Sequence, residues 1–285
     1  MTCEVRIIED SISEGGKRLT TVQLKYWRAI HAELMTHRVF SRNASSSRAI
    51  PVAKMIEQVR TDPAGPIHWG ANQPGMQAGA ELTGEDLLNA KSLWRYAAIR
   101  AAEVAEKMMD LGLHKQVANR ILEPFQYIHV VVTATEWDNF SELRCHPDAQ
   151  PEIQELACAI RDAMAKSKPR LLTNGYWHLP YVSDYERQDG YWKGKETELC
   201  KLSAARCARV SYLLHDGSTP NIAKDLELFD RLVGSKPIHA SPIEHQAQPD
   251  VWVSHGGYEN WSQPGLHGNF VGWNQYRKLF ERTQS

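Results

Sequence analysis

The amino-acid sequence predicts a helix-rich α+β fold with few strands. Two segments, 3–9 and 127–135, are rich in β-branched and other strand-forming residues. In several other segments apolar residues recur three or four positions apart, which is the spacing of an amphipathic helix. The chain has 285 residues, of which 42% are apolar and 24% charged. It can therefore bury a substantial core, as one large domain or two modest ones.

In the first half of the chain, the strand at 3–9 leads into a turn over 11–17, which contains two glycines and two serines. Leu24, Trp27 and Leu34 lie on one helical face and predict a helix over 20–37. Further expected elements are an ordered loop over 61–84, a long helix over 85–111, a short helix over 114–122 that stops at Pro124, and the buried strand over 127–135.

The second half is mostly helical in pattern. Apolar spacing predicts helices over 150–166, 197–208, 220–233 and 268–281, and a strand followed by a loop over 250–266. Residues 168–198 are dense in Tyr, Trp and Gly and are expected to form a loop that joins the two halves. Neither a Rossmann glycine fingerprint nor a Walker A loop is present, so any phosphate must be bound in another way.

The overall charge and composition exclude several classes of protein. The formal net charge of -1 argues against a nucleic-acid partner, which usually attracts a basic surface. No apolar run approaches the roughly 20 residues of a membrane span, and the acidic N-terminus lacks a signal core. The five cysteines form no CxxC pair, which argues against a disulfide framework or a zinc site. We therefore expect a cytoplasmic protein without a membrane partner.

A dense polar cluster occupies residues 36–48, with the sequence Thr-His-Arg-Val-Phe-Ser-Arg-Asn-Ala-Ser-Ser-Ser-Arg. Guanidinium groups and hydroxyls so close together are typical of an anion site, in which Arg side chains pair with phosphate oxygens. A solvated polar loop is the alternative. Because the cluster follows an apolar segment and contains no Gly or Pro, we expect a fixed conformation and favour the anion site.

Three further blocks carry polar side chains in compact groups. The first contains Arg120 and the segment 139–153, in which Arg120 could equally be a cation that complements a helix C-terminus. The others are Arg-Cys-Ala-Arg-Val-Ser-Tyr at 206–212 and His-Ala-Ser-Pro-Ile-Glu-His at 239–245. His239, Glu244 and His245 do not have the HExxH spacing and no further ligand is evident, so we predict no metal site.

Together these blocks resemble the flavin-dependent thymidylate synthases, the ThyX family. That family's Arg-His-Arg signature, followed by seven residues, Ser, one residue and Arg, is similar to Thr36-His37-Arg38 through Ser46 and Arg48. Its Leu-Arg-x4-Ala-Gln-x-Glu-Ile block resembles residues 143–153. Its Ala-Arg-Val-Ser-aromatic and His-x-Ser/Thr-Pro-x-Glu-His blocks resemble residues 208–212 and 239–245.

The order of the blocks differs from the family, in which the last two precede the Arg-His-Arg signature. A circular permutation accounts for this order, since nearby termini on a surface tolerate such a change. The resemblance implies an α+β fold with a small antiparallel sheet and several long helices, circularly permuted, and one catalytic domain over 1–285. If it holds, the 206–245 block packs beside the 36–48 block, with His239 and Ser241 in the same cleft as His37 and Arg38.

The resemblance also assigns roles to individual residues. Arg144 would be the catalytic residue, placed at the pyrimidine ring. FAD would be bound by His37, Arg38, Asn43, Asn139, Ser211, His239 and Ser241. The nucleotide would be bound by Glu33, Ser46, Ser47, Arg48, Arg120 and Arg144. This sequence departs from the family at Thr36, where the first arginine of the signature stands, at Ala44, and at Thr133 and Thr135, which replace flavin-binding residues. These departures predict weak retention of FAD.

The activity implied is reductive methylation of dUMP to dTMP, with 5,10-methylenetetrahydrofolate and NADPH as co-substrates and FAD as cofactor. The family usually forms homotetramers with active sites shared between subunits. One alternative is a hydroxymethyl- or methyltransferase of the same fold that acts on dUMP or dCMP. Another, of a different class, is a non-catalytic nucleotide-binding protein that has lost flavin. A single-stranded nucleic-acid binder is a third alternative, which the near-neutral charge disfavours.

Overall fold

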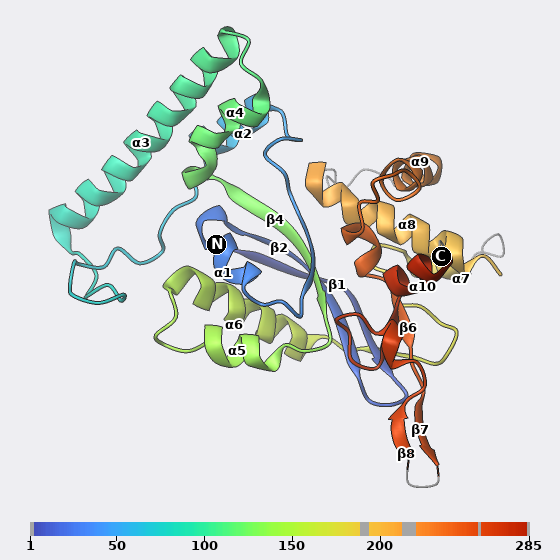
Figure 1. Ribbon diagram of the computed structural model, residues 1–285. Helices are drawn as coiled ribbons and strands as arrows, with labels where there is room; N and C mark the ends of the chain where they lie inside the picture. Colours follow the sequence, from blue (N-terminus) through green and yellow to red (C-terminus); the bar gives the residue numbers. More distant parts are fainter. Residues whose placement is uncertain (1–2, 189–193, 213–220, 256–257, 284–285) are drawn as a thin grey trace.

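The computed structural model describes residues 3–188, 194–212, 221–255 and 258–283. Its centre is a five-stranded sheet in the order β3-β4-β2-β1-β5 (Figure 1). The strands are β1 (Glu4–Ser13), β2 (Arg18–Trp27), β3 (Ser41–Ala44), β4 (Tyr127–Ala134) and β5 (Arg170–Leu172). The pairs β1–β2, β2–β4 and β3–β4 are antiparallel, but β5 runs parallel to β1. The α+β class is confirmed, while the sheet is mixed and not purely antiparallel.

The helix predicted over 20–37 is wrong for its first part, because residues 20–27 belong to the central strand β2. Its even-numbered residues Val22 and Leu24 enter the main core, whereas Leu19 enters a second core on the other face. Burial on both faces removes the polar and apolar alternation by which a strand is usually recognised. A 3-10 turn, η1 (Arg28–Ile30), and the short helix α1 (His31–Met35) follow.

Two helices cover one face of the sheet, α5 (Asp138–Arg144) and α6 (Pro151–Lys166). Figure 1 shows them together beside β1, β2 and β4. Phe140, Ile153 and Leu156 from these helices pack in one buried cluster with Val22 and Val132 from the strands. The prediction of a helix over 150–166 is confirmed to within one residue, as is the strand over 127–135.

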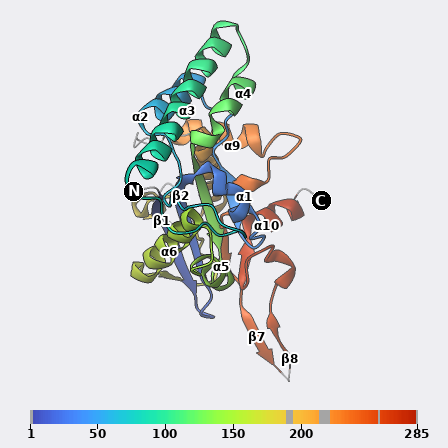
Figure 2. The same ribbon diagram turned by 90° about the vertical axis from the view of Figure 1, so that its left-hand side faces the viewer.

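A helical arm extends from the sheet between β3 and β4 (Figures 1 and 2). It consists of α2 (Val52–Thr61), α3 (Gly84–Asp110), α4 (Lys115–Ala118) and the 3-10 segment η2 (Asn119–Phe125). Val59, Ala98, Ala102 and Leu122 form its core, in which the small alanines let the helices approach closely. The long helix is as predicted. The short one is instead a single α-turn followed by a 3-10 segment that contains Pro124.

The last third of the chain forms a second helical layer on the opposite face of the sheet. Its helices are α7 (Asp184–Gln188), α8 (Glu196–Ala208), α9 (Ile222–Leu232) and α10 (Tyr276–Thr283), with the 3-10 segments η4 (Arg209–Tyr212), η5 (Ser241–Glu244) and η6 (Pro264–Leu266). The helices predicted over 197–208 and 220–233 correspond to α8 and α9, although residue 220 lies outside the described residues. Leu19 of β2 packs with Ala247, Phe270 and Trp273 of this layer.

Three loop and helix boundaries in this layer differ from the sequence prediction. The segment 168–198 contains β5 and α7, although its residues 189–193 lie outside the described part. The segment 250–266 contains a hairpin of β7 (Trp252–His255) and β8 (Tyr258–Trp261), which projects from the body in Figure 1. The last helix begins at Tyr276, because 273–275 form β9, which pairs with β6 (Ala247–Pro249). Among the described helices, none combines the length and apolarity needed to cross a membrane.

Candidate functional site

A cavity of about 520 Å³ opens where three separate parts of the chain meet. Strand β3 supplies Asn43, and the loop after it supplies Ser46 and Arg48. The 3-10 segment η5 with the residues before it supplies His239 and Ser241. The remaining lining residues are Ala49, His114, Lys115, Gln116, Ala208, Leu232 and Pro242. We call this cavity the anion pocket, for the reason that follows from its charge.

The described residues that line the anion pocket include two cations and two histidines, but no Asp or Glu. Neither Arg48 nor Lys115 forms an ion pair with a carboxylate in the described part of the chain. An uncompensated positive charge in a concave surface attracts an anion, and Ser46 and Ser241 add hydroxyl donors. The chemistry of the pocket therefore fits a phosphate group.

The 45–50 loop is held firmly by hydrogen bonds to its neighbours. The amide of Asn119, a fully buried residue, donates to the Ser47 carbonyl at 2.6 Å and to the Ile50 carbonyl at 3.1 Å. The Ser47 hydroxyl donates to Glu123 Oε1 at 3.1 Å, and the Ser45 backbone pairs with His129 of β4. The loop is thus pre-organised, as the absence of Gly and Pro from its sequence predicts.

Asn43 lines this pocket and carries a buried donor. Its side chain is 5% exposed, and its Nδ2 atom has no hydrogen-bond partner among the described residues. A buried amide without a partner costs about 1–3 kcal/mol, so such a group in a cavity wall is suited to a ligand that accepts a hydrogen bond. Asn43 is held in place by the pairing of β3 with β4, opposite Val131.

Hydrogen bonds also connect the block that contains His239 and Ser241 to β3. The His239 amide donates to the Leu232 carbonyl at 2.9 Å, and Gln275 Nε2 donates both to the Glu244 carbonyl at 3.0 Å and to Ser41 Oγ at 3.3 Å. The predicted packing of the 206–245 block beside the 36–48 block is therefore observed. His239 and Ser241 share their cavity with Asn43, Ser46 and Arg48, however, and not with His37 and Arg38.

A second group of predicted residues surrounds Arg144 in the last turn of α5. Its Nη1 donates to Glu33 Oε2 at 2.7 Å, its Nε to His37 Nε2 at 3.2 Å and its Nη2 to Thr36 Oγ1 at 3.4 Å. Because Nε2 of His37 accepts, this imidazole carries its proton on Nδ1. Burial, together with the nearby Arg144 and Arg42, lowers the pKa of His37, which keeps it neutral. We call Glu33, Thr36, His37 and Arg144 the arginine cluster.

A chain of buried hydrogen bonds connects the sheet to the end of the 239–245 block. His178 Nδ1 bonds to Ser11 Oγ at 2.9 Å and its Nε2 to Thr21 Oγ1 at 2.8 Å. Thr21 Oγ1 bonds to Thr133 Oγ1 at 2.7 Å, and Thr133 Oγ1 bonds to His245 Nδ1 at 2.8 Å. Both histidines are fully buried. Thr133, one of the positions where the sequence departs from the family pattern, is therefore a structural link in this chain.

Acidification is expected to destabilise the protein through these two histidines. Burial lowers the pKa of His245 to about 3 and the pKa of His178 well below its usual value. Between the lowered pKa values of the two buried histidines and the unfolded-state pKa of about 6.5, only the unfolded chain binds a proton at these side chains. The free energy of unfolding therefore falls as the pH falls. Each histidine contributes up to about 1.4 kcal/mol per pH unit to this slope.

Urea unfolding at pH 7 and pH 5 measures this effect. The variant His178→Asn should show a flatter pH dependence than the wild type, whereas His255→Asn, at an exposed position, should keep the full slope. An unchanged slope in His178→Asn would contradict the account.

Other predicted site residues lie outside the anion pocket. Arg120 is exposed and pairs with Glu123 at 2.8 Å, and Ser47 donates to the same carboxylate, so both have a structural partner. Arg38 and Asn139 are exposed, on the segment after α1 and on α5 respectively. Ser211 belongs to η4, but its side chain lies outside the described residues. Sequence reasoning missed His114, Lys115 and Gln116, which reach the pocket only through the packing of α4.

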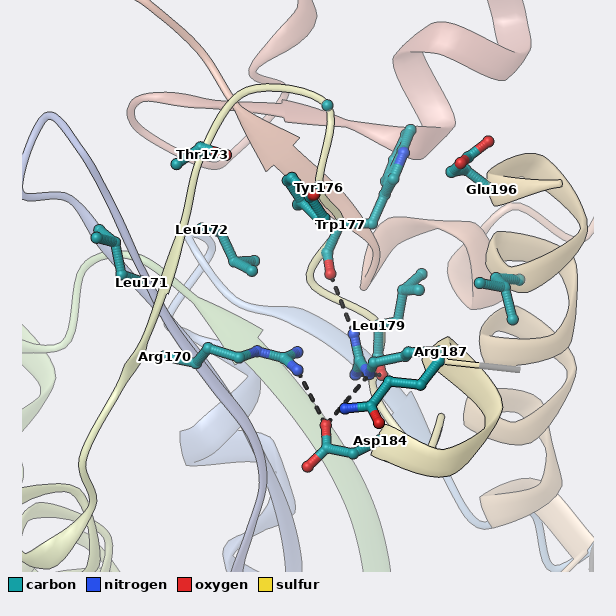
Figure 3. Close-up of a pocket in the computed structure, with 13 residues that line it drawn as sticks. Arg170, Leu171, Leu172, Thr173, Tyr176, Trp177, Leu179, Asp184, Arg187 and Glu196 are labelled. Atoms are coloured by element: carbon teal, nitrogen blue, oxygen red, sulfur yellow. Dashed lines mark hydrogen bonds and ion pairs between the residues drawn. The ribbon is translucent and has the colours of Figure 1, made fainter. Parts of the chain in front are cut away.

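A larger cavity, of about 700 Å³, lies between β5 and helices α7 and α8 (Figure 3). Its cations are already neutralised, because Arg170 bonds to Asp184 at 3.0 Å and Arg187 bonds to Glu9 at 2.7 Å. Apolar side chains such as Leu172 and Leu179 form much of its wall. None of the predicted site residues lines it, so the anion pocket is the better candidate site. Among the described residues, no group of three His, Cys, Asp or Glu side chains could hold a metal ion.

Comparison with known proteins finds similar solved structures. Its structure is similar to a UMP/dUMP methylase, PolB, from Streptomyces cacaoi bound with 5-Br UMP, at 19% identity and a TM-score of 0.46 over 57% of this chain and 89% of that one. It is also similar to the flavin-dependent thymidylate synthase ThyX from Helicobacter pylori with FAD and dUMP, at 18% identity and a TM-score of 0.35 over 51% and 67%. No curated protein matches the sequence.

The family model of the thymidylate synthase complementing proteins matches residues 19–170, just over half of the chain. The match includes the 36–48 cluster, Arg120 and Arg144, and it ends before the 208–212 and 239–245 blocks. The circular permutation thus stays a prediction. The chain belongs to the thymidylate synthase complementing protein family, Thy1.

Proposed function

We propose that this protein is a flavin-dependent thymidylate synthase, which methylates dUMP to dTMP. The observation that carries the proposal is the anion pocket, in which a pre-organised Ser/Arg loop meets the His239–Ser241 segment without any carboxylate among the described lining residues. In the overall reaction dUMP takes one carbon from methylenetetrahydrofolate and a hydride that originates from NADPH. The other products are tetrahydrofolate and NADP⁺.

In this proposal Ser46 and Arg48 bind the nucleotide phosphate, because a guanidinium can pair with two phosphate oxygens at once. Asn43, His239 and Ser241 would hold FAD, and the unpartnered Asn43 amide supports this fit. The chemistry that the flavin supplies is hydride transfer from its reduced form. The protein residues bind and orient the reactants.

Arg144 is proposed to stabilise negative charge on the pyrimidine ring, which makes carbon 5 more nucleophilic. Three of the five N–H donors of Arg144 are used by Glu33, His37 and Thr36, which leaves two for a ligand. These three contacts fix the plane of the guanidinium before a ring arrives. A fixed donor needs no reorganisation as charge develops, which is the main source of electrostatic catalysis.

The arginine cluster does not line the anion pocket of the same chain. A site that uses both groups would therefore be completed by assembly, and we propose a homotetramer with shared active sites. In such an assembly Arg120, which is more than half exposed here, could also approach a phosphate bound by another subunit.

The proposal is tested by an absorbance spectrum and a product assay on the whole chain. We expect oxidised-flavin bands in the purified protein or after addition of FAD, and formation of dTMP from dUMP with methylenetetrahydrofolate and NADPH. Mass spectrometry of the products from dUMP and dCMP separates methyl from hydroxymethyl transfer and uracil from cytosine nucleotides. If the protein binds dUMP but neither binds FAD nor forms a product, the non-catalytic alternative is correct.

A further inference from the structure

Lys115 is placed at the anion pocket by the helical arm, 66 positions from Ala49 of the Ser/Arg loop in the sequence. It is the first residue of α4, is half-buried and lines the cavity. Its Nζ donates to the Ala49 carbonyl at 3.2 Å, directly after Arg48 in the chain. This hydrogen bond anchors the ammonium group beside the loop and uses one of its three donors, which leaves two free to contact a ligand.

The charge around Lys115 also points to an anion. Its hydrogen bond is to a neutral carbonyl, and no carboxylate lines the pocket among the described residues. Cations on protein surfaces are commonly paired or fully solvated. Lys115 and Arg48, which have no ion-pair partner among the described residues, line this cavity from different elements. An anion bound between them would relieve the electrostatic repulsion between the two positive charges.

We propose that Lys115 is a second cationic contact for the nucleotide phosphate, so that the pocket recognises a dianionic phosphoryl group between Arg48 and Lys115. This inference rests on the proposed function, since it takes the ligand to be a nucleotide. Arg48 supplies a planar pair of donors, and Lys115 supplies a point charge from the helical arm. Specificity for a phosphorylated nucleotide over a nucleoside then depends both on the loop that carries Arg48 and on α4, which carries Lys115.

Calorimetric titration of dUMP, deoxyuridine and inorganic phosphate tests the inference. Lys115→Gln should weaken dUMP and phosphate binding about tenfold or more, which is the usual size of a charge-assisted contact, and leave deoxyuridine binding unchanged. Lys115→Arg should retain most of the affinity. The matched control is Lys107→Gln, at an exposed position of α3 outside the pocket, which should bind all three ligands as the wild type does.

Salt dependence separates a charge contact from a loop anchor. Loss of a phosphate contact flattens the dependence of dUMP affinity on ionic strength, whereas loss of the Ala49 hydrogen bond alone lowers affinity without changing that slope. An unchanged slope in Lys115→Gln, or dUMP affinity equal to the wild type, would overturn the inference. If Lys115→Gln weakens phosphate binding but the wild type forms no dTMP, the proposed function fails and the phosphate contact stands.

Discussion

Replacement of Asp225 by alanine is expected to lower the free energy of unfolding by about 3–5 kcal/mol, the usual cost of removing one partner from a buried ion pair. Asp225 lies in α9 and is fully buried. Its carboxylate accepts from Arg206 Nε at 3.0 Å and from Arg209 Nε at 2.6 Å. Without it, the buried Arg206 and the partly buried Arg209 both lose a partner.

The second carboxylate of this network cannot compensate for the loss. Glu186 already binds Arg206 through two hydrogen bonds, of 2.6 and 2.9 Å. Burial alone would raise the pKa of Glu186, but hydrogen bonds from Arg206 and Ser183 outweigh burial and lower it to about 2. Its carboxylate is therefore already engaged by Arg206 and Ser183, and Glu186 does not replace Asp225 as the partner of Arg209.

Urea denaturation measures the effect of Asp225→Ala. The matched control is Asp230→Ala, on the same helix at an exposed position, which should change stability by less than about 0.5 kcal/mol. Because Ala208 and Leu232 at the ends of α8 and α9 line the anion pocket, the variant should also bind dUMP more weakly. A loss of stability below about 1 kcal/mol would show that the network contributes little.

Replacement of Arg144 by lysine is expected to reduce kcat about a hundredfold or more, as is typical when a donor to developing charge is lost. The side chain is 16% exposed and contacts three residues in a fixed plane. Lysine keeps the charge but concentrates its donors on one atom, so it cannot hold these contacts and still present two parallel N–H groups. Nucleotide binding should weaken far less than turnover, since the contact strengthens as ring charge develops.

Steady-state kinetics with dUMP separate these effects on kcat and KM. Arg100→Lys, on an exposed turn of α3, is the control and should retain wild-type turnover. A normal unfolding midpoint for Arg144→Lys would show that the loss is not a folding defect, and Arg144→Gln should be at least as inactive. Turnover of Arg144→Lys within about threefold of the wild type would mean that Arg144 is structural.

The arginines of the 206–212 block illustrate what the sequence left undetermined. The Ala208–Tyr212 motif supports the family resemblance, but only the structure shows that Arg206 and Arg209 share Asp225 of α9. An ion pair between two helices leaves no periodic trace in the sequence, because each partner alone looks like an ordinary surface charge. The same holds for Glu123, which binds Ser47 and Arg120 and so removes two predicted phosphate ligands from the anion pocket of their own chain.

The sequence by itself determined the elements whose patterns are local. The helices α3, α6, α8 and α9 and the strand β4 follow from apolar spacing and β-branched content, and the Ser/Arg loop follows from its composition. Local backbone preference and the burial of a single helical face act within a few residues, which is why such elements can be read from the chain. The motif blocks likewise identified the family, which its model independently matches.

Tertiary structure alone decided the central strand and the composition of the pocket. Residues 18–27 form β2 because β1 and β4 supply its hydrogen bonds on both edges and two separate cores bury its faces, which outweighs its helical apolar spacing. Lys115 reaches Ala49 across 66 positions because α4 packs against the loop through the neighbouring Asn119. Contacts between residues so distant in the sequence depend on how the whole chain folds, and no local pattern encodes them.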